Sequence, residues 1–162
     1  MDTLYVWPIL TLILALILIY RKPKTKNMII ESLLLALLVV MVGLSSIWAF
    51  MGHAFMSARI AAYIGWPAGS PFQLEVAVAN LSYGILGLLC LKFRDDFWTA
   101  TIIGFAVFYL GAAYIHIQDM FRGNYAPGNV GAPLYFDIIL PILLLGLLAA
   151  YKLTKKEVNL PI

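Results

Sequence analysis

The segment MGHAFMSARIAAYIGWPAGSPFQLEVAVAN, residues 51–80, is the longest interruption between the apolar segments of this chain. It carries His53 near its start and Gln73, Glu75 and Asn80 in its second half. Polar side chains beside long apolar runs are costly in hydrocarbon unless they are paired or in contact with water. We therefore expect residues 51–80 to cap one end of a membrane helix bundle and to contribute to its functional site.

The overall composition is that of a membrane protein. Of the 162 residues, 63% are hydrophobic and 12% are charged, whereas soluble domains are about half apolar and about a quarter charged. The length suits a single domain, residues 1–162. The net charge of +3 does not indicate nucleic-acid binding, because the basic residues lie in short runs beside apolar segments. The single cysteine, Cys90, excludes an internal disulfide and a cysteine-rich metal cluster.

Apolar runs predict the number of membrane crossings. About 20 helical residues are needed to span about 30 Å of hydrocarbon. Two connections, 55–71 and 119–132, are rich in glycine and proline, and the first fits a short amphipathic helix anchored at the interface by Tyr63 and Trp66. The sequence predicts an all-α, polytopic bundle with five transmembrane helices at approximately 3–20, 28–54, 72–92, 97–118 and 133–152.

Lysine and arginine gather beside one set of helix ends. Only Arg59 and Arg122 lie in the connections 55–71 and 119–132. The positive-inside rule therefore predicts that the N-terminus and these two connections lie outside, and that the C-terminus is cytoplasmic. The other nine basic residues lie on the opposite side: Arg21, Lys22, Lys24, Lys26, Lys92, Arg94, Lys152, Lys155 and Lys156.

Four ionisable side chains fall at about one depth in the outer halves of the predicted helices. They are His53, Glu75, His116 and Asp137, and they define a hypothetical ligand-binding site. Two imidazoles and two carboxylates suit a divalent metal such as zinc, manganese or iron, and the same groups could equally relay protons or hold a quinone oxygen or a lipid headgroup. The side chains expected to orient this site are Gln73, Asn80, Gln118 and Tyr135.

Each of these residues also has a purely structural interpretation. A histidine at a helix end can face interfacial water. Glu75, in the first turn of a helix, favours the positive end of the helix dipole. Asn80 is placed for a hydrogen bond between helices, which is common in membrane proteins. There is no HExxH, CxxC or glycine-rich phosphate loop, so a metal site rests on position alone.

Two groups of residues carry a family resemblance over roughly residues 40–145. They are Ile64-Gly65-Trp66, Ser70-Pro71-Phe72-Gln73, Glu75-Val76, Ala79-Asn80-Leu81, His116, Gly123-Asn124, Ala126-Pro127-Gly128-Asn129, Gly131, Tyr135, Asp137-Ile138 and Leu140-Pro141. With these residues the sequence resembles a family of small bacterial and archaeal membrane proteins known as a domain of unknown function. The step Gly52-His53 and the compact bundle are also loosely similar to DoxX-type membrane proteins, which implies a redox role.

The function expected from these features is ligand binding in the cell membrane. The ligand would be a small molecule, lipid headgroup, quinone or metal ion held in a polar pocket of the outer leaflet. Catalysis is left open, with redox or hydrolytic chemistry as the classes that the histidines suit. The alternatives are an accessory subunit of a larger membrane complex and a transporter. Membrane lipids are the expected partners, nucleic acid is not expected, and homo-oligomers are compatible with so small a bundle.

Overall fold

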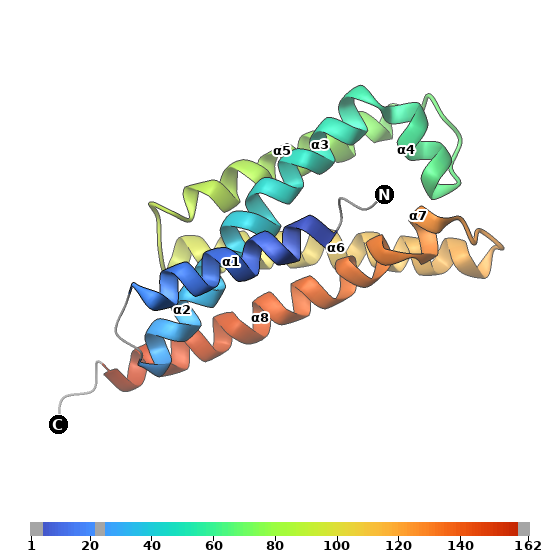
Figure 1. Ribbon diagram of the computed structural model, residues 1–162. Coiled ribbons are helices and arrows are strands. Elements are labelled where there is room, and N and C mark those ends of the chain that lie inside the picture. The colour runs from blue at the N-terminus through green and yellow to red at the C-terminus, as the bar shows by residue number, and fades with distance from the viewer. Residues whose placement is uncertain (1–4, 22–24, 159–162) are drawn as a thin grey trace.

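The computed structural model describes residues 5–21 and 25–158, and within these ranges every regular element is a helix (Figure 1). This confirms the all-α prediction. A π-helical segment, η2, joins α2 to α3 without a break in the chain of helical residues. In order, the elements are α1 (Val6–Tyr20), α2 (Lys26–Leu37), η2 (Leu38–Leu44), α3 (Ser45–Phe55), α4 (Ser57–Ile64), α5 (Phe72–Leu89), α6 (Asp96–Phe121), α7 (Pro127–Val130) and α8 (Ala132–Val158).

Among the residues that the structure describes, four helical segments are long and apolar enough to cross a membrane. These are Lys26–Phe55, Phe72–Leu89, Asp96–Phe121 and Pro127–Lys155. The remaining apolar helix, α1, has 15 residues, which is fewer than the approximately 20 needed for a crossing. The start predicted for this helix, residues 3 and 4, lies outside the described residues.

The long helices are arranged as two pairs. Helix α3 packs along α5, and α6 packs along α8 (Figure 1). Helix α2 contacts α8, so the continuous segment α2–η2–α3 begins beside one pair and ends within the other. The π-helical segment lies at this crossover, where a wider helical turn allows the axis to change direction.

Glycines allow the chain to pass from one pair to the other. A Cβ atom built on Gly87 would lie 2.4 Å from the backbone nitrogen of Gly43 and 2.7 Å from the carbonyl oxygen of Leu38. One built on Gly84 would lie 2.6 Å from the side chain of Ile47. The backbones of α5 and η2 are therefore in direct contact, as is common for small residues in membrane helices.

The apolar core lies around the crossover. Its largest fully buried side chains include Trp98, Phe105, Leu34, Leu38 and Leu144, which come from α2, η2, α6 and α8. These five side chains are aliphatic or aromatic, and they fill the interior of the bundle where α2, η2, α6 and α8 meet. Close packing of these side chains joins α2 and η2 to α6 and α8.

The turn between α5 and α6 is tied to the C-terminal part of α8. Asp95 accepts hydrogen bonds from Lys155 and, at 3.0 Å, from the hydroxyl of Tyr151. The hydrogen bond from Lys155 is the main reason why the pKa of the Asp95 carboxyl is below its usual value. Beside this turn, the indole of Trp98 donates to the carbonyl of Cys90 at 3.0 Å, and burial raises the pKa of the Cys90 thiol to about 11.

Helices α4 and α7 pack together at the opposite end of the bundle (Figure 1). The short helix predicted in residues 55–71 is present as α4. The two residues expected to anchor it also pack on the protein: Tyr63 contacts Gly128 of α7, and the indole of Trp66 donates to Asp119 of α6 at 2.9 Å. We refer to α4, α7 and their flanking connections, residues 56–71 and 122–131, as the cap.

Candidate functional site

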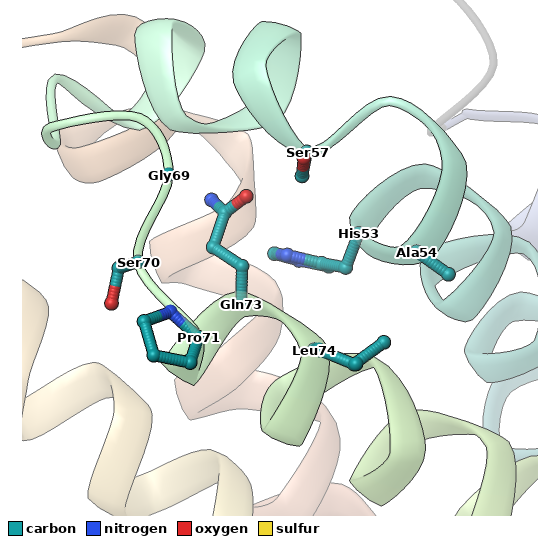
Figure 2. A pocket seen from close by; sticks show the side chains of 8 residues that line it. All are labelled: His53, Ala54, Ser57, Gly69, Ser70, Pro71, Gln73 and Leu74. Carbon is teal, nitrogen blue, oxygen red and sulfur yellow. The ribbon is translucent and has the colours of Figure 1, made fainter.

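A polar pocket lies where α3 ends and α5 begins. It has a volume of about 380 Å³. Figure 2 shows the imidazole of His53 and the carboxamide of Gln73 converging in this space, with Ser57 of α4 across from them. The side chain of Ser70 points away, and its hydroxyl accepts a hydrogen bond from the backbone of Phe72. The lining residues are His53, Ala54, Ser57, Gly69, Ser70, Pro71, Gln73 and Leu74.

The local chain path explains how a helix end and a helix start face each other. The backbone at Met56 leaves helical geometry, with φ −130° and ψ 35°, so α4 departs from α3 at an angle. Helix α4 then ends at Gly65, which has φ +84°. A side chain there would also collide with Asn124, since a Cβ atom would lie 2.5 Å from its Oδ1. The positive φ and the lack of space for a Cβ atom both require glycine at this position. The left-handed turn at Gly65 reverses the chain, which then returns to α5.

The pocket contains buried polar atoms that have no hydrogen-bond partner in the described part of the chain. They are Nδ1 of His53 and both Nε2 and Oε1 of Gln73. The side chain of Gln73 is notable because the residue is only 6% exposed. Buried polar groups in folded proteins are almost always satisfied, so these three atoms indicate that a small polar group or water occupies the space.

Glu75 is not part of this pocket. It is exposed and borders a neighbouring hollow with Pro71, Leu74 and Val78. The sequence placed Glu75 and His53 at one depth, and depth alone did not bring their side chains to a common space. As a first-turn residue of α5, Glu75 retains the role of an acid at the positive end of a helix.

The other two predicted ligands form a separate pair. Nε2 of His116 lies 3.9 Å from Oδ2 of Asp137, and both side chains are nearly buried. On its other side, Nδ1 of His116 is 2.7 Å from Oδ1 of Asn129 in α7. The indole of Trp66 stacks on the imidazole with 5.5 Å between ring centroids. His116 is thus held by α6, α7, α8 and the connection that follows α4.

A hydrogen-bond network in the cap surrounds this pair. The carboxylate of Asp119 accepts from the indole of Trp66 at 2.9 Å and from the amide of Asn124 at 2.6 Å. The same Asn124 amide donates to the carbonyl of Ile64 at 2.9 Å. Asp119 therefore connects the end of α6 with the end of α4.

The four residues predicted to orient the site lie in different parts of the structure. Asn80 accepts a hydrogen bond of 2.7 Å from Tyr109, deep in the bundle. Gln118 donates to the hydroxyl of Tyr114 on its own helix at 2.5 Å. Tyr135 is 62% exposed. Of the four residues expected to orient the site, Gln73 alone lies in the pocket.

The metal hypothesis finds no matching donor set. Among the described residues there is no group of three or more His, Cys, Asp or Glu side chains that could hold a metal ion. His53 lies with Gln73, His116 lies with Asp137, and Glu75 is apart from both. The four predicted ligands do not make a single shell in this arrangement.

A comparison with known protein families identifies the family of this chain. A family model described as a family of unknown function (DUF6790) matches residues 1–157. The chain belongs to this family. The match includes both the pocket and the His116–Asp137 pair, and it agrees with the predicted resemblance to a family of unknown function. No curated protein and no solved structure matches the chain.

In this DUF6790 member, three residues that the sequence analysis did not assign to the site contact His116 or its neighbour Asp119. Trp66, Asn124 and Asn129 contact His116 or Asp119 directly. The available signal was that all three lie within the motifs that carry the family resemblance, in connections rich in glycine and proline. The contact of Trp66 with Asp119 joins residues that are 53 apart in the chain, so sequence spacing gave no sign of it.

Proposed function

We propose that the chain is a multi-pass protein of the cell membrane whose pocket between α3, α4 and α5 binds a small uncharged polar group. The observation that carries this proposal is the buried, unpartnered carboxamide of Gln73 beside the unpartnered Nδ1 of His53. The described residues that line the pocket include no Asp, Glu, Lys or Arg. A hydroxyl or carbonyl of a quinol, quinone or lipid headgroup suits these neutral donors and acceptors.

The topology is part of this proposal. We propose that α1 is a fifth crossing, that the N-terminus and the cap lie outside, and that the C-terminus is cytoplasmic. The support is the distribution of basic residues, nine against two, together with the four longer apolar helices. Single cysteines introduced at Arg59 and Lys92 in a Cys90→Ala background test it. A membrane-impermeant maleimide should label the first from outside intact cells and the second after lysis only.

Binding can be tested by native mass spectrometry on protein taken from membranes in mild detergent. The probes to add are a short-chain ubiquinol and phosphatidylglycerol, each of which presents hydroxyl groups. Wild-type protein should retain one of these or a co-purifying small molecule, and Gln73→Leu should lose it. The matched control is Gln118→Leu, which removes a glutamine at the same end of the bundle but outside the pocket.

The alternative roles give different results in the same experiment. An accessory subunit would show no bound small molecule and would remain in a larger complex on a native gel. A transporter would need a polar path to the other face. The apolar core around Trp98 and Phe105 fills that part of the bundle, which favours binding over transport.

A further inference from the structure

The hydrogen bonds of Asn129 determine which nitrogen of His116 carries a proton. The side-chain nitrogen of Asn129 donates to two carbonyl oxygens, that of His116 at 3.2 Å and that of Asn124 at 2.9 Å. Carbonyl oxygens only accept, so the amide orientation of Asn129 is fixed. Its Oδ1 must then be the atom that lies 2.7 Å from Nδ1 of His116, and Nδ1 must be the donor.

The position of this proton determines whether Nε2 of His116 presents a proton or a lone pair to Asp137. In a neutral imidazole with its proton on Nδ1, Nε2 has a lone pair and no proton. That nitrogen lies 3.9 Å from Oδ2 of Asp137. No hydrogen bond to the Asp137 carboxyl is present within the part of the chain that the structure describes. Without a further proton, a lone pair would face a nearly buried carboxylate that has no donor, which is an unfavourable arrangement.

We propose that His116 and Asp137 form a proton-binding site, which takes up one proton at Nε2 of the histidine or Oδ2 of the aspartate. Uptake of one proton converts the repulsive pair into an imidazolium beside a carboxylate, or into an imidazole beside a carboxylic acid. Either form removes the unfavourable contact. The site is distinct from the His53–Gln73 pocket, so it does not depend on the proposed ligand.

Two other titratable side chains face the pair. Asp119 lies three residues after His116 on α6, where Trp66 and Asn124 donate to its carboxylate. Tyr109 lies on the same helix near Asp137 and donates to Asn80. From α7 and from the connection after α4, the groups that contact His116 are the uncharged Asn129 and Trp66. Asp119 is therefore the group that the experiment must separate from the pair.

The chain is well suited to a direct test, since it has only two histidines. Full-length protein labelled with ¹⁵N-histidine can be reconstituted in nanodiscs and followed by NMR, with His53→Gln used to assign the signals. At high pH, His116 should be the tautomer with its proton on Nδ1. Between about pH 9 and about pH 5, a single proton uptake should be visible in the His116 nitrogens or in the ¹³C-labelled carboxyl of Asp137.

Variants separate the pair from its neighbours. Asp137→Asn removes the carboxylate at almost constant shape, and the proton uptake seen in the wild type should be lost or displaced to lower pH. Asp119→Asn should retain the transition. The proposal is wrong if His116 carries its proton on Nε2 at high pH, if neither residue titrates in this range, or if the Asp137→Asn variant takes up a proton at the same pH as the wild type. The tautomer is measured on wild-type protein, so an unstable variant would not prevent a decision.

Discussion

The hydroxyl of Tyr109 donates a hydrogen bond of 2.7 Å to Oδ1 of Asn80, and this bond joins α6 to α5 across the two helix pairs. The amide nitrogen of Asn80 donates to the carbonyl of Val76 at 2.9 Å, so both ends of the side chain are used. This supports the structural interpretation of Asn80. The residue connects helices, and the pocket lies elsewhere.

Tyr109→Phe should destabilise the bundle by about 0.5–1.5 kcal/mol, the usual net contribution of one hydrogen bond. The ring packing should survive, because Phe105 stacks on Tyr109 with 4.1 Å between centroids and needs no hydroxyl. Unfolding by SDS titration measures the change. In a double-mutant cycle with Asn80→Ala, the two losses should be less than additive. Strict additivity would mean that the bond contributes nothing to stability.

The close contact between α5 and η2 predicts a large difference between two glycine substitutions. Gly87→Ala should lower the free energy of unfolding by at least about 2 kcal/mol, because its Cβ would lie 2.4 Å from the backbone of Gly43. Gly111→Ala, on α6, meets no atom within 4 Å and should be neutral or slightly stabilising. The same SDS titration compares them. Equal effects would show that α5 and η2 are farther apart than described.

The thiol of Cys90 should be unreactive in the folded protein. It is fully buried, and burial raises its pKa to about 11, so little thiolate exists near neutral pH. Mass spectrometry after maleimide treatment at about pH 7.5 should show no adduct. Unfolding in SDS should give one adduct per chain, and a cysteine introduced at the exposed Asp96 should react without unfolding. Rapid labelling of native Cys90 would contradict the packing around Trp98.

Asp95 gives a pH-dependent contribution to stability. Its pKa in the folded protein is below the unfolded value, mainly through the hydrogen bond from Lys155. The contribution is therefore fully present above the unfolded pKa of about 4, and it is lost as the pH falls through the lowered folded value. The side chain is 52% exposed, so we expect less than about 1 kcal/mol.

Asp95→Asn tests this with little change of shape, since asparagine differs from aspartate by an amide in place of the carboxylate. The melting temperature of the variant should lie below that of wild type at about pH 7, and the difference should shrink as the pH falls below about 4. A difference that stays constant with pH would mean that the carboxylate charge is not its source.

The sequence predicted the helices well and the site only in part, for a physical reason. Runs of apolar residues determine which segments are helical and how deep each polar residue lies. They do not determine which helices are neighbours. Because α3 pairs with α5 and α6 pairs with α8, His53 meets Gln73 and His116 meets Asp137. The four residues expected at one depth are therefore divided, and Glu75 lies in neither place.

Contacts made by the cap were also beyond sequence reasoning. Trp66 was expected at the membrane interface, as tryptophans at helix ends often are. The structure adds that it stacks on His116, after the left-handed turn at Gly65 has redirected the chain. Such a contact depends on the fold of two connections at once, and no periodicity of hydrophobic residues encodes it.

Replacement of Gln73 by leucine distinguishes an empty polar pocket from a site that binds a ligand. An unpartnered buried amide costs free energy, so Gln73→Leu should raise the free energy of unfolding of ligand-free protein by about 1–3 kcal/mol. The same change should abolish any stabilisation by the short-chain ubiquinol or phosphatidylglycerol probe, whereas Gln118→Leu should keep it. Thermal melting in detergent, with and without each probe, measures both effects.

If Gln73→Leu changes neither stability nor the response to probes, ordered water satisfies the carboxamide and the pocket is not a ligand site. If the variant gains stability and wild type binds a probe, the chain retains a destabilising glutamine for the sake of binding, as functional sites often do.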